Sequence, residues 1–278
     1  MGVKRKDIGR GIYEYIIMIV AAFAALFPII WVLVSSFKTN NEIMSSSFAP
    51  PASLHLGGYI EALGRVNIPA RFMTSLLVAS VSTLIGVAIY AMSAYVLARV
   101  TFKGRNLIFT LFISSMLIPG NALLQPIFLM INKIGLYDTK TGLILVYIGF
   151  GMPISLFLLR SCFLGIPKAL EEAAIIDGAG FLRVFFSIML PLARPALISS
   201  AILMFLGNWN ELLYALMLTT SEENRTLPLT IKFFTTTFGF DYSAMLAAIV
   251  ICVAPAVIIY ILLQRQIMGS MVAGAVKG

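Results

Sequence analysis

Residues 169–196 read ALEEAAIIDGAGFLRVFFSIMLPLARPA and hold three carboxylates within seven residues, at Glu171, Glu172 and Asp177. Pro167 is well placed to begin a helix, and Gly178 to end one. The helix between them would have about 11 residues and a length of roughly 16 Å, whereas a membrane-spanning helix needs about 20 residues. Because a carboxylate at mid-bilayer costs about 2.5 to 3.5 kcal/mol, we predict a short helix outside the bilayer core.

The predicted short helix combines acids with small side chains. Leu170, Ala173 and Ala174 share a face through three- and four-residue spacing, and the two alanines permit the close approach of another surface. The segment FLRVFFSIML that follows is aromatic and amphipathic, and Pro191 should help to redirect the chain after it. Docking of a partner is the favoured interpretation; a plain connector between two spans is the alternative.

The composition of the whole chain is that of a membrane protein. Of its 278 residues, 60% are hydrophobic and 12% are charged, whereas soluble domains average about half and about a quarter. The net charge of +8 resides in short clusters between apolar runs, a pattern that orients membrane proteins rather than one that binds nucleic acid. Neither GxxxxGK[ST] nor GxGxxG is present, so any ATP must bind to another chain. One histidine and two isolated cysteines predict neither a metal site nor a cofactor site.

Six segments are apolar enough to cross a bilayer or come close to it. Thirteen of the twenty Lys and Arg residues fall on the side that holds both termini, which the positive-inside rule makes the cytoplasmic side. We therefore predict a multi-pass protein of the cell membrane with cytoplasmic N and C termini. The predicted spans are Ile12 to Phe37, Phe72 to Ala98, Asn106 to Asn132, Thr141 to Leu159, Pro195 to Thr220 and Tyr242 to Gln264.

Two of the outward-facing loops are long enough to dock a partner. The first, residues 38–71, is rich in proline and glycine, and the third, residues 221–241, joins polar SEENRT to aromatic FFTTTFGF. Each could equally serve only as a connection.

Polar side chains inside the third and fifth spans are candidates for a translocation path. Such groups are costly in a bilayer unless they face another helix or a wet cavity. Pro119 and Gly120 should break the third span, and a broken helix is tolerated where it is buried in protein or lines a cavity. Interhelical hydrogen bonds or a simple packing kink would explain the same residues. The candidates are Asn208, Trp209, Asn210 and Glu211 in the fifth span and Asn121 and Gln125 in the third.

The opening stretch resembles the EAA loop of the membrane subunits of binding-protein-dependent ABC importers. Glu-Ala-Ala is followed after three residues by Gly178, and after nine more by Ile-x-Leu-Pro. The matching positions are Glu172, Ala173, Ala174, Gly178, Ile188, Leu190 and Pro191. In that family the loop forms a coupling helix that fits a cleft on the ATPase subunit. The resemblance implies ATPase coupling at Glu171, Glu172, Ala173, Ala174, Asp177, Gly178 and Ala179.

Further stretches narrow the resemblance to carbohydrate-uptake permeases of the maltose MalG type. These stretches are IGLYDTKTGLIL, FLGIPKALEEAAIIDGAG, GNWNELLYAL and the C-terminal GSMVAGAVKG. In such permeases the tail reaches the ATPase pair, which implies contacts at Gly274, Val276, Lys277 and Gly278. One departure is Thr74, where many members have asparagine, so no role is carried over to that position.

The resemblance implies an all-α integral membrane protein with the type I ABC importer permease fold. Its six transmembrane helices and cytoplasmic coupling helix would form a single permease domain over residues 1–278. The EAA loop would span residues 167–191, and a cytoplasmic tail residues 265–278. The implied location is a prokaryotic inner membrane, in contact with membrane lipid.

The implied function is a non-catalytic sugar-import subunit that alternates access to a translocation path. Its implied partners are a second homologous permease, two ATPase subunits that use ATP and Mg, and an external sugar-binding protein. By the same resemblance the third outer loop is the favoured docking site for that protein, and Trp209 would suit stacking on a sugar face. The alternatives are an importer permease for an amino acid or osmolyte, or a membrane-embedded transferase using Glu211 with Asn208 and Asn210. No second mid-membrane acid partners Glu211, which disfavours the transferase.

Overall fold

The computed structural model describes residues 5–236 and 241–275, and their side chains over residues 13–232, 241–258, 260 and 261. Every regular element formed by these described residues is helical. The chain divides into two compact units, one made of residues 1–68 and 230–254 and the other of residues 69–229 and 255–278. Each unit is described by itself.

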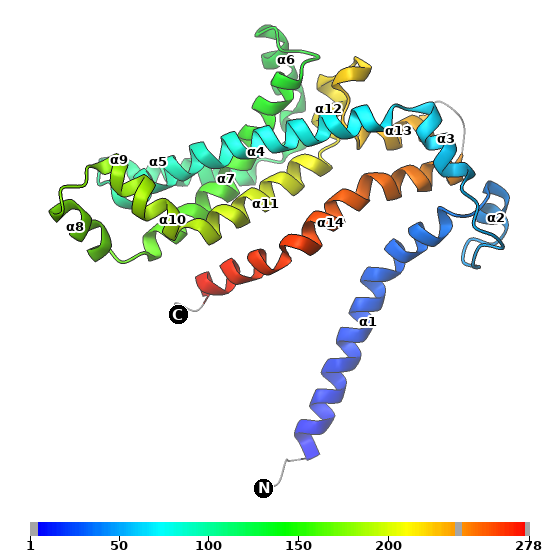
Figure 1. Ribbon diagram of the computed structural model, residues 1–278, viewed down its shortest axis with the longest axis horizontal. Coiled ribbons are helices and arrows are strands. Elements are labelled where there is room, and N and C mark those ends of the chain that lie inside the picture. The colour runs from blue at the N-terminus through cyan, green and yellow to red at the C-terminus, as the bar shows by residue number, and fades with distance from the viewer. Residues whose placement is uncertain (1–4, 237–240, 276–278) are drawn as a thin grey trace. The chain divides into compact units, whose positions relative to one another are not determined.

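The second unit contains most of the long helices (Figure 1). The long helix α4 (Ile68–Arg99) contributes nearly its whole length, and α7 (Lys140–Gly165) is the other uninterrupted long helix of this unit. The remaining elements are α5 (Arg105–Ser114), η1 (Ser115–Leu117), η2 (Gly120–Leu123), α6 (Leu124–Lys133), α8 (Ala169–Ile176), α9 (Phe181–Val184), η3 (Phe185–Met189), α10 (Leu190–Leu192), α11 (Arg194–Asn210), α12 (Leu213–Leu218) and η4 (Glu222–Asn224).

The first unit holds α1 (Arg5–Ser35), α2 (Asn40–Ser45), α3 (Gly57–Arg65), most of α13 (Leu229–Thr236) and the first part of α14 (Tyr242–Ala275). A capping box begins α2, because Thr39 and Glu42 each bond to the other's backbone. The buried Lys38 ammonium donates to the carbonyls of Ser46 and Ser47, at 3.2 and 3.0 Å. The loop after α1 is therefore held by internal hydrogen bonds.

The predicted spans are only partly continuous helices. By length and composition, Tyr13–Ser35, Ile68–Arg99 and Lys140–Gly165 can each cross a membrane. Two further candidates are bent pairs, Arg105–Leu117 with Gly120–Lys133 at 98° and Phe181–Leu192 with Arg194–Asn210 at 74°. The apolar helix Tyr242–Ile258 is shorter. The break predicted at Pro119 is confirmed, and the total of six spans stays a prediction.

The fifth predicted span, Pro195 to Thr220, is wrong as one continuous helix. The helix ends at Asn210, Glu211 has an extended backbone, and helix resumes at Leu213. The Glu211 carboxylate accepts hydrogen bonds from the first free N–H groups of α12. A side-chain acceptor at a helix start satisfies donors that would otherwise be unpaired. The acid that looked misplaced in the span therefore starts a new helix.

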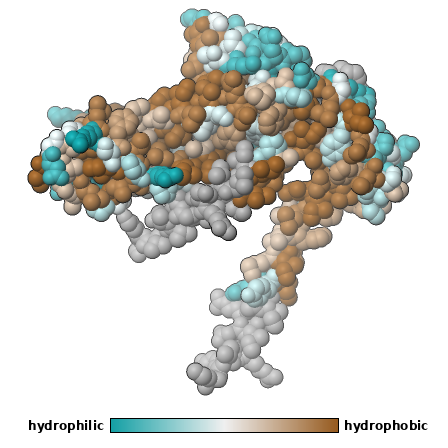
Figure 2. Space-filling view, viewed as in Figure 1, coloured by the Kyte–Doolittle hydropathy of each residue, from teal (hydrophilic) through white to brown (hydrophobic). Residues whose placement is uncertain are grey.

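Apolar side chains cover much of the exposed surface as well as the core. Figure 2 shows hydrophobic residues over most of the face of α4 in view. No residue in the most apolar 18-residue window of the α1 span is buried within the chain, as expected for a helix whose apolar sides meet lipid or another membrane subunit. Two clusters fill the interior of the second unit. One is centred on Tyr95, Leu159 and Phe185, and the other on Leu143, Tyr147 and Leu218.

Candidate functional site

The short acidic helix predicted from the sequence is α8, and it ends at the predicted glycine. Gly178 has a φ of +81°, in the left-handed region. Its N–H donates to the Ile175 carbonyl at 3.0 Å, and the Ala179 N–H donates to the Ala174 carbonyl at 2.9 Å. This pair of bonds is the Schellman motif, which favours glycine because a Cβ is strained at that backbone angle. Gly178 thus sets where α8 stops and how the chain leaves it.

The three carboxylates of α8 point in different directions. The Glu171 side chain is only 15% exposed and forms an ion pair with Arg99 of α4, at 3.2 Å between Oε1 and Nε. Glu172 and Asp177 are exposed. Glu171 therefore faces the body of its own chain, and the other two acids are available to a second surface.

The apolar residues of α8 divide in the same way. Ala174 is the buried residue of the helix and joins the cluster centred on Tyr95. Ala173 is exposed, as are Ile175 at 61% and Ile176 at 85%. Ala173 is therefore available to a second surface, whereas Ala174 packs within its own chain. Contact of these two alanines with an ATPase subunit stays a prediction.

The last residues of the EAA motif lie in η3 and α10, the short helical segments that precede the long helix α11. Ile188 and Leu190 are half-buried against the cluster centred on Tyr95, and Pro191 is exposed. The five residues of η3 form a π-helical turn, a wide turn that often marks functional sites in helices. Figure 1 shows α8, α9 and α10 at one end of the second unit and α12 toward the other.

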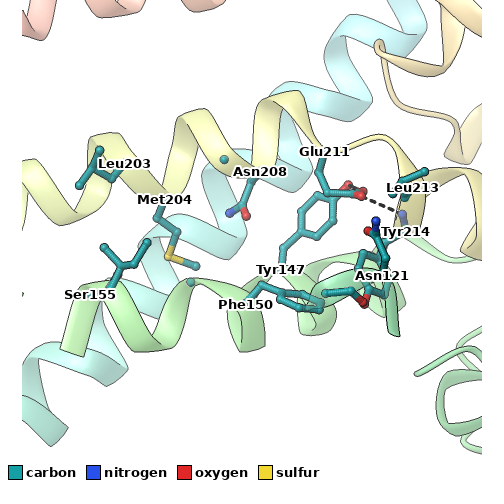
Figure 3. A pocket seen from close by; sticks show the side chains of 14 residues that line it. Asn121, Tyr147, Phe150, Ser155, Leu203, Met204, Asn208, Glu211, Leu213 and Tyr214 are labelled. Atoms are coloured by element: carbon teal, nitrogen blue, oxygen red, sulfur yellow. Dashed lines mark hydrogen bonds between the residues drawn. The ribbon is translucent and has the colours of Figure 1, made fainter. Parts of the chain in front are cut away.

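Three of the six polar candidates in the spans line a cavity, and the other three do not. A cavity of about 290 Å³ lies between η2, α7, α11 and α12, and Asn121, Asn208 and Glu211 line it (Figure 3). Gln125, Trp209 and Asn210 are not among the residues that line this cavity. The apolar part of the wall includes Phe150, Ile154, Leu203 and Met204.

Glu211 is held by three hydrogen bonds at the break between α11 and α12. Oε2 accepts from the Tyr147 hydroxyl at 2.7 Å and from the Ala215 N–H at 3.0 Å, and Oε1 accepts from the Tyr214 N–H at 2.8 Å. The Tyr214 hydroxyl donates in turn to the Gly120 carbonyl at 2.6 Å, which satisfies backbone at the break of the third span. The two broken helices are therefore joined across the cavity wall.

Three candidates of the fifth span, Asn208, Trp209 and Asn210, have partners within the protein. The Asn208 amide donates to the Ser82 hydroxyl of α4 at 2.9 Å, and Asn210 donates to the Leu206 carbonyl of its own helix at 2.9 Å. Trp209 is 1% exposed, with ring contacts to Phe72 at 5.5 Å and to Phe205 at 5.8 Å between centroids. The Trp209 ring therefore does not offer a free face for a sugar in this conformation.

The loop of residues 219–227 is attached to the rest of the unit through Asp138. This residue precedes α7 and has a φ of +54°. Its carboxylate accepts from the Thr220 N–H at 2.8 Å and from the Ser221 N–H at 3.0 Å, and the Ser221 hydroxyl also donates to it. Burial by itself would raise the pKa of Asp138, but these hydrogen bonds hold it well below its ordinary value. Sequence reasoning missed this residue, because nothing in LYDTKTG indicates a partner 82 positions away.

The same loop is also fastened to the start of α4. The buried Arg71 guanidinium pairs with Glu222 at 2.7 Å, and the Leu227 N–H donates to the Ser75 hydroxyl at 2.7 Å. Thr74, the departure from the family pattern, donates to the Glu223 carbonyl at 3.1 Å. The polar part of this loop is therefore held by contacts to two other parts of the unit, the segment before α7 and the start of α4.

The predicted contacts at the C terminus fall at the limit of the structure. Gly274 lies in the last turn of α14. Val276, Lys277 and Gly278 lie outside the described residues.

Apolar spans interrupted at polar residues, with a short acidic helix between two of them, define a membrane transport component. The chain belongs to the family described as binding-protein-dependent transport system inner membrane component, whose sequence profile matches residues 1–271. The predicted resemblance is thereby confirmed.

Relatives and solved structures agree with this membership. The diacetylchitobiose uptake system permease protein NgcG of Streptomyces coelicolor is 37% identical over 95% of this chain and 88% of its own length. The trehalose/maltose transport system permease protein MalG of Thermococcus litoralis is 36% identical over 99% of both chains. A subunit of a bacterial ABC transporter involved in the import of the acidic polysaccharide alginate has a TM-score of 0.81. That alignment covers 95% of this chain and 99% of the other at 24% identity, which supports the fold alone.

Proposed function

We propose that this chain is the permease subunit of an ATP-driven importer for a sugar or an oligosaccharide. The observation that carries the proposal is α8, a short helix that presents Glu172, Ile175, Ile176 and Asp177 to solvent. A mixed apolar and acidic surface, held in one geometry by the Schellman turn, suits a cleft on a partner protein. The curated relatives that are sugar permeases supply the substrate class.

In this proposal the chain works in an assembly and performs no chemistry itself. A second, homologous permease completes the membrane part, and two ATPase subunits bind ATP and Mg at the cytoplasmic side. A binding protein delivers the sugar to the external side. With α8 on the ATPase subunits, both termini are cytoplasmic in this proposal, and the C-terminal residues Gly274, Val276, Lys277 and Gly278 add a second ATPase contact.

The cavity beside Glu211 is the proposed segment of the translocation path. It combines amide groups of Asn121 and Asn208 with the aromatic ring of Phe150, the mixture that sugar-binding sites use for hydroxyl groups and ring faces. The hydrogen bonds of Glu211 are directed to the protein, so its role in the proposal is to hold the shape of the path. Alternating access would result if this cavity opened first to one side of the membrane and then to the other.

Reconstitution of the complete importer in liposomes tests the proposal. The chain, its partner permease and the ATPase subunits are supplied with external binding protein and a panel of solutes. The panel contains maltose, trehalose, diacetylchitobiose and, for contrast, amino acids and osmolytes. We expect ATP-dependent accumulation of a sugar and no ATP hydrolysis by the purified chain alone. If only an amino acid or an osmolyte accumulates, the proposed substrate class is wrong. If the chain alone hydrolyses ATP, its proposed role as a non-catalytic subunit is wrong.

A further inference from the structure

The ion pair between Glu171 and Arg99 joins the short helix α8 to the end of the long helix α4. Their side chains are 15% and 5% exposed. The two facing atoms, Glu171 Oε1 and Arg99 Nε, are buried and have no hydrogen-bonding partner among the described residues. At these two atoms, the negative charge of Glu171 and the positive charge of Arg99 therefore compensate each other. Separating the pair would leave a buried charge without compensation, which is strongly destabilising in proteins.

Arg99 also joins α4 to α7. Its Nη2 donates to the carbonyl of Ile166, the residue that caps the C terminus of α7. Arg160 of α7 makes the reciprocal contact, since its Nε donates to the Leu97 carbonyl in the last turn of α4 at 3.1 Å. An arginine of each helix therefore donates to a carbonyl at the C-terminal end of the other helix. The helix dipole favours a cation at that end.

Aromatic packing surrounds this polar junction. The ring of Tyr95, one turn before Arg99, lies 5.6 Å from Phe163 of α7, 5.2 Å from Phe181 of α9 and 5.0 Å from Phe185 of η3. Close-packed interiors transmit displacement rather than absorb it. The ends of α4 and α7 and the segments α9 and η3 therefore form one connected block, to which α8 is attached through Ala174 and through the pair of Glu171 with Arg99.

We propose that Arg99 is the positioning residue through which movement of α8 reaches the membrane helices α4 and α7. This inference rests on the proposed function, in which an ATPase subunit moves α8. Because Glu171 is on the inner face of α8 and Glu172 on the outer face, one acid holds the helix to its own chain while the other meets the motor. Neutralising Glu171 would let α8 follow the ATPase while α4 and α7 lag behind.

The test measures sugar transported per ATP hydrolysed by the complete reconstituted importer. Glu171→Gln keeps the shape of the side chain and removes its charge. We expect ATP hydrolysis to continue and the transport ratio to fall about tenfold, within the usual range of coupling between protein sites. Arg99→Gln should give a similar loss. The double variant should be no worse than either single variant, because residues in contact behave non-additively.

Two further variants separate coupling from folding. Lys103→Gln removes an exposed positive charge from the loop after α4 and should leave the ratio unchanged. Arg99→Lys keeps a cation opposite Glu171 and should keep at least about half of the ratio, since a lysine retains the charge although not the planar donor group. If Glu171→Gln does not assemble, the role of Arg99 is decided by comparing the sugar transported per ATP hydrolysed in Arg99→Lys and in Arg99→Gln.

Three outcomes would overturn the inference. They are a normal ratio in Glu171→Gln, additive losses in the double variant, and equal losses for lysine and glutamine at position 99. Absence of ATP-dependent uptake by the wild-type assembly would instead contradict the proposed function.

Discussion

At the scale of single residues, Gly178 has the clearest requirement. Its positive φ is a conformation that a side chain disfavours, and a Cβ built at this position meets no atom within 4 Å. Within this chain, the glycine is therefore needed for its backbone angle and not for space. Close approach by an ATPase subunit would be a second, separate reason for glycine.

Alanine and asparagine at position 178 distinguish these two reasons. Gly178→Ala should weaken the end of α8 by about 1 to 2 kcal/mol and reduce ATP-dependent sugar uptake by the reconstituted importer. Gly178→Asn should be milder, because asparagine adopts the left-handed region more readily than alanine. The measurements are uptake and the thermal unfolding midpoint. If asparagine is as harmful to uptake as alanine while stability is retained, contact with a partner is the dominant reason for glycine.

Glu211 illustrates how a residue's surroundings change its interpretation. An acid in an apolar span suggested a path residue or a reacting group, whereas the structure directs its carboxylate to Tyr147 and to the start of α12. Both oxygens of this half-buried side chain accept hydrogen bonds from the protein, so the carboxyl group is satisfied where it lies. Its position beside the cavity nevertheless makes the shape of the proposed path dependent on it.

At the scale of elements, breaks in the helices matter more than their lengths. The third and fifth spans are both interrupted, and Tyr214 bonds the second interruption to the first. The loop of residues 219–227 is similarly attached at two places, through Asp138 and through Arg71. These contacts fix the conformation of a stretch whose composition alone predicts only a polar loop.

Replacing Asp138 tests the attachment of the loop of residues 219–227. Asp138→Asn keeps a residue that tolerates the positive φ and removes the charge. Hydrogen exchange at the amides of Thr220 and Ser221 should become about tenfold faster at pH 7, since hydrogen bonds to a charged group are the stronger kind. Glu223→Gln, which removes an exposed acid from the same loop, should leave this exchange nearly unchanged.

The pH dependence of this protection follows from the lowered pKa of Asp138. The folded carboxyl titrates below its ordinary value of about 3.9, so the stability that it contributes is fully present above that value. It is lost as the pH falls toward the folded pKa. The difference between wild type and Asp138→Asn should therefore persist at pH 5 and shrink below about pH 3.9. Equal exchange in the two proteins at pH 7 would contradict the attachment.

At the scale of the whole molecule, the proposed function requires one orientation in the membrane. The excess of Lys and Arg on the side of the termini predicts that α8 is cytoplasmic. Residues 219–227 then face outward, because α11 and α12 lie between them and α8.

Labelling with a membrane-impermeant maleimide checks this orientation. Cys162 and Cys252 are first replaced by alanine. A cysteine at the exposed position Glu223 should then react in intact cells, and one at the exposed position Ile176 should react only in inverted vesicles. The reverse pattern would place the acidic helix outside the cell and remove the basis for ATPase coupling.

From the sequence it was possible to predict the membrane class, the short helix between the fourth and fifth spans, its end at Gly178 and the break at Pro119. These features depend on local properties: apolar length, helix-ending residues and the spacing of a motif. The family also followed from that spacing, because residues 172–191 carry the pattern without reference to any distant contact.

The contacts of the folded chain were needed to establish which acids of α8 face inward, which polar residues share a cavity and where the fifth span breaks. Each of these depends on pairs that are far apart in the sequence, such as Arg99 with Glu171, Tyr147 with Glu211 and Asp138 with Thr220. A buried charge takes whichever partner the fold brings within hydrogen-bonding distance, and local periodicity does not encode that choice. The three carboxylates of the opening stretch are alike in sequence, and packing alone makes one of them internal.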